Sequence, residues 1–96
     1  MQGCTATAQH EDAQVRVTRY DFAPGGQTGW HVHDMDYVIV PVTDCAMRLE
    51  VEGGAAREVQ FAAGGSYKGT RGTAHNVVNA GAAPMSFVEV EVKPQD

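Results

Sequence analysis

The stretch WHVHDMDYVIVP, residues 30–41, joins a pair of histidines to a run of β-branched and aromatic residues. Side chains of these types are enriched in strands, so residues 37–42 are expected to form a buried strand. Pro41 has no N–H group to donate, which places it at an edge, a bulge or the end of that strand. His31 and His33 point to the same side of an extended segment, about 6.6 Å apart along the backbone. The stretch therefore predicts a strand-rich fold with two imidazole rings on one face.

Period-two alternation interrupted by Gly and Pro continues along the chain and predicts seven or eight short strands. Besides residues 37–42, the expected strands are residues 15–20, 29–33, 46–52, 57–61, 75–79 and 86–93. The Gly53-Gly54 pair is typical of a tight hairpin turn, and Pro24, Gly25 and Gly26 predict a bend after the first of these strands. No segment has helical apolar spacing over a helical length. An all-β chain with so many short strands is expected to close into an antiparallel barrel or jelly roll.

Alternation also predicts which side chains face the interior. In the strand at residues 46–52, the face expected inside carries Met47, Leu49 and Val51. In the strand at residues 86–93, Glu89 and Glu91 share a face with Phe87, opposite three valines. We expect both glutamates to point outward from an apolar interior, whereas in a barrel with a polar cavity one of them could reach a metal.

Length and composition favour one globular domain. The 96 residues are 43% hydrophobic and 20% charged, which fits a single domain over residues 1–96 with residues 1–13 as an N-terminal arm. The net charge of −5 gives no basic surface for a phosphate backbone, so nucleic acid is not an expected partner. The apolar runs are far shorter than the roughly 20 residues of a membrane helix, and residues 1–12 do not resemble a signal peptide. We therefore expect a cytoplasmic protein without a membrane partner.

A third histidine supports a metal site. His75 follows a glycine-rich turn and begins a β-branched segment that ends at Asn79, a turn-type residue expected to be structural. Neutral imidazole binds divalent transition metals well, so His31, His33 and His75 are candidate ligands for one ion of iron, nickel, zinc, copper or manganese. If no metal binds, the three rings are ordinary polar residues of a barrel that acts only as an interaction partner.

The two histidine clusters together resemble the cupin family. Its first motif is Gly, five residues, His-x-His and, after three or four residues, Glu, and this chain has Gly25, His31 and His33 at those spacings. Its second motif is Gly, five residues, Pro-x-Gly, two residues, His, three residues, Asn. That motif is matched, with Thr in place of Pro, by Gly64, Thr70, Gly72, His75 and Asn79. The chain looks most similar to small single-domain cupins, some of which are named for β-alanine degradation.

The resemblance implies a cupin-type double-stranded β-helix, a metal ion at the barrel mouth and a homodimer. One position departs from the motif, because Tyr37 and Val38 stand where the glutamate ligand is expected. Asp36 is the best substitute, but on a regular strand it faces away from His33 unless residues 34–35 form a bulge. Water or a substrate oxygen could instead fill that position, and three protein ligands with an open place are typical of catalytic centres.

Residues around the expected site suggest a small ligand. Trp30 and Tyr37 flank the histidines and are candidate substrate contacts, although large aromatic residues also fill the cores of small barrels. Lys68 and Arg71 precede His75 and could attract a carboxylate group. Two functions remain open: a metalloenzyme of dioxygenase, isomerase or lyase type acting on a small organic acid, and a non-catalytic ligand-binding module with a structural metal or none.

Overall fold

The computed structural model describes residues 1–95 and consists of strands and connecting loops, with no helix in that range. Its strands are β1 Gln2–Glu11, β2 Val15–Gln27, β3 His31–Val32, β4 Asp36–Pro41, β5 Cys45–Val51, β6 Arg57–Phe61, β7 Tyr67–Gly69, β8 Ala74–Asn79 and β9 Met85–Val92. The expected all-β class is therefore confirmed. Within the same range, nothing helical is long and apolar enough to cross a membrane.

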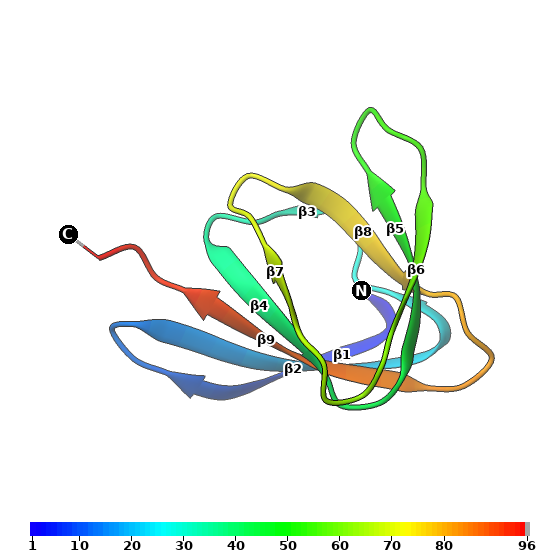
Figure 1. Ribbon diagram of the computed structural model, residues 1–96, viewed down its shortest axis with the longest axis horizontal. Coiled ribbons are helices and arrows are strands. Elements are labelled where there is room, and N and C mark those ends of the chain that lie inside the picture. Colours follow the sequence, from blue (N-terminus) through cyan, green and yellow to red (C-terminus); the bar gives the residue numbers. More distant parts are fainter. Residues whose placement is uncertain (96) are drawn as a thin grey trace.

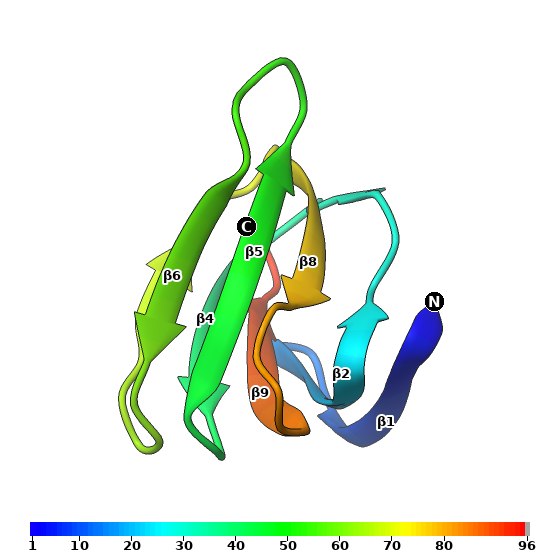
Figure 2. The ribbon, with the colours of Figure 1, turned by 90° about the vertical axis from the view of Figure 1, so that its right-hand side faces the viewer.

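The strands form one antiparallel sheet that curls on itself (Figure 1). The hydrogen-bonded order is β6-β5-β8-β2-β9-β4-β7, with β1 added to β2 and β3 added to β8. Strand β2 joins the two halves, because its first part pairs with β9 while Gln27 pairs with Val78 of β8. The bend expected after residue 20 lies inside this strand, where Gly25 has φ +76°. The β5–β6 hairpin projects beyond the rest of the sheet (Figure 2).

The inner faces of the strands build the core that holds the site. Its buried members are Phe22, Tyr37, Ile39, Cys45, Met47, Leu49, Val77, Met85 and Phe87. The expected inward face of β5 is confirmed for Met47 and Leu49, whereas Val51, at the end of the strand, is 38% exposed. Pro41 ends β4, as its missing N–H group predicted.

Strand β9 corrects one expectation. Glu89 and Glu91 point inward and are only 6% and 7% exposed, so the prediction that they face outward is wrong. They lie on the same side as Phe87, while Val92 is 46% exposed at the strand's end. The physical reason is that this end of the barrel encloses a polar cavity, where Arg16 on the neighbouring β2 pairs with Glu91.

The N-terminal residues 2–11, expected to be part of an arm, form strand β1. This strand pairs with β2 over most of its length, with irregularities between Gln2 and Cys4 and between Ala8 and His10. Nearly all of its residues are exposed. It therefore extends the sheet at one edge and adds little to the core.

Gly69 in β7 is opposite Tyr37 in β4, and a methyl group added there would overlap the Tyr37 ring. Because Tyr37 is 4% exposed, its ring has little free space into which to move. We expect Gly69→Ala to lower the free energy of unfolding by about 1–3 kcal/mol. The melting temperature, measured by circular dichroism, should fall by about 4–8 °C per kcal/mol.

Gly65→Ala is the control for that substitution. A Cβ atom at Gly65 would lie 3.3 Å from its nearest neighbour, the backbone oxygen of Ala62, so a small adjustment accommodates it. We expect its melting temperature to remain within about 2 °C of the parent. Equal melting temperatures for the two variants would contradict the predicted overlap with Tyr37.

Candidate metal centre

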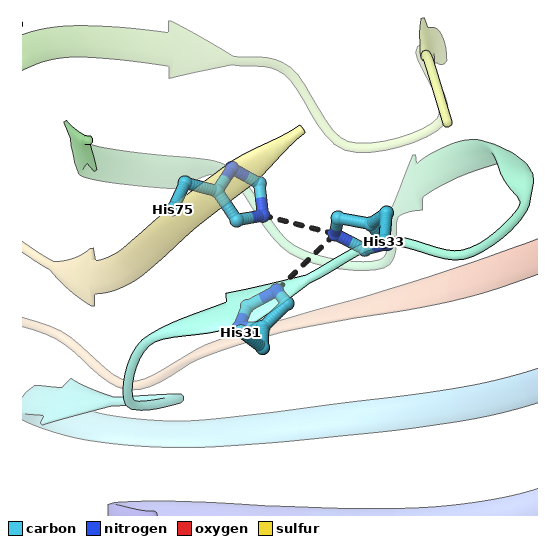
Figure 3. A group of neighbouring side chains, drawn as sticks. All are labelled: His31, His33 and His75. Atoms are coloured by element: carbon cyan, nitrogen blue, oxygen red, sulfur yellow. Dashed lines mark hydrogen bonds between the residues drawn. The ribbon is translucent and has the colours of Figure 1, made fainter. Parts of the chain in front are cut away.

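Pairing of β3 with β8 brings the three histidines together. His31 in β3 is the direct partner of His75 in β8. His33 follows β3 and continues the pairing, because its N–H group donates to the carbonyl of Thr73 at 2.9 Å. The Gly72 N–H group in turn donates to the His33 carbonyl at 2.8 Å. Two segments far apart in the sequence thus place three imidazole rings side by side (Figure 3).

The three rings turn the same nitrogen atom toward one another. The Nε2 atom of His33 lies 3.2 Å from Nε2 of His31 and 3.0 Å from Nε2 of His75. Nitrogens each about 2.1 Å from one ion are about 3.0 Å apart at a right angle and about 3.4 Å apart at the tetrahedral angle. The rings meet edge to face, with interplanar angles of 73–81°. The three candidate ligand atoms all lie within 4.8 Å of one another, so the group could hold a divalent transition metal ion.

Burial keeps two of these rings in the form that binds metal. Desolvation, together with the charge of the neighbouring His31, lowers the pKa of His33 to about 4. The pKa of His75 is lowered to about 4 by the same causes. At neutral pH both rings are therefore uncharged, each with one nitrogen lone pair free for an ion.

A backbone carbonyl fixes the orientation of His31. Its Nδ1 atom lies 2.9 Å from the Gly29 carbonyl oxygen, so Nδ1 carries the proton and Nε2 is left as the donor atom. The loop that contains this carbonyl is held by Asn76, whose Oδ1 atom accepts from the Gly29 N–H group at 2.9 Å. The Asn76 amide donates to Gln27 at 2.8 Å and to Glu50 at 2.9 Å. The sequence reasoning missed Asn76, and its position beside His75 was the only signal.

The histidines line one wall of a cavity of about 430 Å³. Tyr37 lines it too, and its ring stacks on His33 with centroids 3.8 Å apart and planes 21° apart. Glu89 places Oε1 3.8 Å from Nδ1 of His33, and its Oε2 accepts from the Tyr20 hydroxyl at 3.5 Å. Burial, together with the charge of Glu91, raises the pKa of Glu89 to about 7. The cavity thus combines a candidate metal group with a buried carboxyl group.

Arg16 and Glu91 form an ion pair in the same cavity. The guanidinium donates from Nε to Oε1 at 2.7 Å and from Nη2 to Oε2 at 2.9 Å. This two-point contact engages both carboxylate oxygens of Glu91. It also leaves the Arg16 charge largely balanced, so Arg16 is not a free cation for a ligand.

The structure does not bring Asp36 to the histidines. Its Oδ1 atom accepts from the Arg71 N–H group at 2.8 Å, and Lys68 Nζ lies 3.9 Å from Oδ2. On β4 it is on the face opposite Tyr37, as expected for a regular strand. Trp30 is 59% exposed and lies outside the cavity lining.

Asn79 has the structural role expected of it. Its side chain is 2% exposed, and Oδ1 accepts from the Gly81 N–H group at 3.0 Å. The amide donates to the carbonyl oxygens of Ala23 at 3.2 Å and Ala83 at 2.9 Å. Asn79 therefore closes the turn between β8 and β9, away from the histidines.

Comparison with known proteins matches residues 18–91 to the cupin domain family, a range that includes all three histidines. The chain therefore belongs to the cupin family. It is 46% identical over 87 residues to the β-alanine degradation protein BauB of Pseudomonas aeruginosa, covering 91% of this chain and 90% of that protein.

Solved structures show the same architecture. A cupin domain from Bordetella pertussis Tohama I is 42% identical and superposes with a TM-score of 0.91, covering 97% of this chain and 96% of that one. KdgF from Halomonas is 17% identical with a TM-score of 0.73, covering 98% and 82% of the two chains, and shares the fold. The cupin-type double-stranded β-helix expected from the sequence is thereby confirmed.

In the metal-free protein, His33 and His75 should titrate with midpoints near pH 4, because burial disfavours their charged forms. Imidazole C–H chemical shifts followed by NMR from pH 3 to 8 measure this directly, with signals assigned from single histidine variants. In the unfolded chain a histidine titrates near pH 6.5. Between about pH 6.5 and pH 4 the unfolded chain therefore binds protons at these two histidines, whereas the folded chain does not. Their contribution to stability is therefore present above about pH 6.5 and is lost as pH falls toward 4. Midpoints near 6.5 for both rings would contradict this burial.

Proposed function

We propose that this cupin holds one divalent transition metal ion on His31, His33 and His75 and uses it to bind a small organic molecule in the cavity. The observation that carries the proposal is the convergence of the three Nε2 atoms on one wall of that cavity. Such an ion would polarise a ligand oxygen or activate water or dioxygen. Iron, nickel, zinc, copper and manganese all remain candidates, because an all-imidazole set suits most of them.

The cavity supports an oxygen-bearing ligand, such as a small organic acid. Its lining includes one cationic side chain, Arg16, which is engaged by Glu91. The negative charge of a carboxylate ligand would therefore be balanced by the bound metal ion. Tyr37, whose ring forms part of the cavity wall, is the proposed aromatic contact. The name of the Pseudomonas aeruginosa relative refers to β-alanine degradation, which is in keeping with a small acid as ligand.

We infer a metal-dependent enzyme of dioxygenase, isomerase or lyase type as the first form of this function. Three protein ligands leave coordination positions open, and open positions are typical of catalytic sites. The second form is a non-catalytic ligand-binding module with a structural metal or none. Exchangeable water on the bound ion and turnover of one of a panel of small acids support the enzyme. A closed metal shell and the absence of turnover support the module.

The metal site is tested by elemental analysis of protein purified without added metal. We expect about one metal ion per chain in the parent and less than about a tenth of that in His75→Ala, because two imidazoles bind far more weakly than three. His10→Ala is the control, since His10 is exposed and contacts Asp12 on the β1–β2 hairpin. Equal trace metal in all three proteins would reject the proposal.

We further propose a homodimer. Strand β1 pairs only with β2 among the described strands, so its outer edge is free to pair with another chain. Light scattering after size-exclusion chromatography should give the mass of two chains at micromolar concentration, and the mass of one chain would contradict this.

We also propose a cytoplasmic location. The free thiols of Cys4 and Cys45 are in keeping with a reducing compartment.

A further inference from the structure

His33 differs from His31 in what faces its second ring nitrogen. Its Nε2 atom points at the other two histidines, at 3.2 and 3.0 Å. A neutral imidazole that offers Nε2 to an ion carries its proton on Nδ1. In His31 that proton goes to the Gly29 carbonyl at 2.9 Å. In His33 the corresponding atom faces the Glu89 carboxylate, with 3.8 Å between Nδ1 and Oε1.

The stack with Tyr37 does not replace this contact. Two rings 3.8 Å apart and 21° from parallel restrain the plane of the His33 imidazole. A stack on the ring face accepts no proton from the ring edge, so it does not determine which nitrogen carries hydrogen. That choice depends on the acceptor opposite Nδ1.

Glu89 is placed to be that acceptor. It is 6% exposed and lies on β9 opposite Ile39 of β4, with its side chain in the cavity. Its Oε2 atom accepts from the Tyr20 hydroxyl. The nearby cation, Arg16, donates to both oxygens of Glu91 and so does not draw Glu89 away. Oε1 of Glu89 is therefore left to face His33.

We propose that Glu89 is a positioning residue for the metal centre, accepting the Nδ1 proton of His33 and so holding Nε2 of that ring toward the ion. The inference rests on the proposed function, because it concerns the same three histidines. The present separation exceeds a hydrogen bond by roughly 1 Å, a distance that rotation of the flexible glutamate side chain covers. Partners of this kind change metal affinity by about 10–100-fold when removed.

The first test measures Zn²⁺ affinity by competition with a chromophoric chelator. We expect Glu89→Ala to weaken zinc binding by about 10–100-fold, because His33 loses its acceptor. Glu89→Gln keeps an acceptor oxygen at nearly the same place and should recover most of that loss. Asp34→Asn is the matched control, since Asp34 lines the same cavity and its charge also acts on His33, so this variant measures the effect of losing a negative charge alone. Its affinity should stay within about threefold of the parent.

The second test reads the proton itself. In the Zn²⁺-loaded protein, proton-nitrogen NMR should show slowly exchanging, downfield Nδ1–H signals for both His31 and His33. In Glu89→Ala the His33 signal should shift upfield or exchange too fast to observe. The His31 signal should stay in place, because its acceptor is a backbone carbonyl. A general loss of structure would move both signals together.

The outcomes separate this inference from the proposed function. If the parent binds no zinc, the metal site itself is rejected, and the role of Glu89 falls with it. If the parent binds zinc and Glu89→Ala binds it as tightly with an unchanged His33 signal, the positioning role alone is overturned. Zinc binding by Glu89→Gln as weak as by Glu89→Ala would also overturn it, because an acceptor oxygen would then not suffice.

Discussion

The short pairing of β3 with β8 is the constraint on which the site depends. Strand β3 has two residues, and backbone hydrogen bonds beyond its end continue the contact as far as Gly72. This pairing sets His31 opposite His75 and brings His33 to both. The histidine rings contribute little to that arrangement themselves, because neutral imidazoles whose Nε2 atoms face one another have no strong mutual attraction. The backbone pairing and the hydrogen bonds of Asn76 therefore hold the three ring nitrogens in place.

Much of this was readable from the sequence because strand period and motif spacing are local properties. The alternation around residues 46–52 and 86–93 located β5 and β9. The spacing within the two histidine motifs predicted the family, which is confirmed, and indicated the candidate ligands His31, His33 and His75. The short strand β7 and the N-terminal strand β1 were not foreseen as strands. Three residues are too few for a periodic signal, and β1 has little apolar patterning because nearly all of it is exposed.

The side chains around the histidines were harder to place. Alternation separated Glu89 and Glu91 from the valines correctly, but it does not show which face is inside, and charged residues normally favour the solvent side. Their burial depends on Arg16 and Tyr20 from β2, which are distant in sequence. In the family's first motif a carboxylate follows the histidine pair. Here Tyr37 occupies one of the two places for it, and the buried carboxyl groups of the cavity, Glu89 and Glu91, belong to β9.

The alternation of β8 ties the histidine site to correct strand pairing. His75 and Asn76 are adjacent, so His75 joins the other two rings while Asn76 reaches Gln27 and Glu50 on the neighbouring strands. If β8 paired one residue out of register, His75 and Asn76 would each point to the opposite face of the sheet. The contacts of the His75 ring and those of the Asn76 amide would then be lost together. If the proposed ion binds, it would favour the properly registered chain over misaligned ones by mass action. Ligation would then help to select the correct strand register of the barrel.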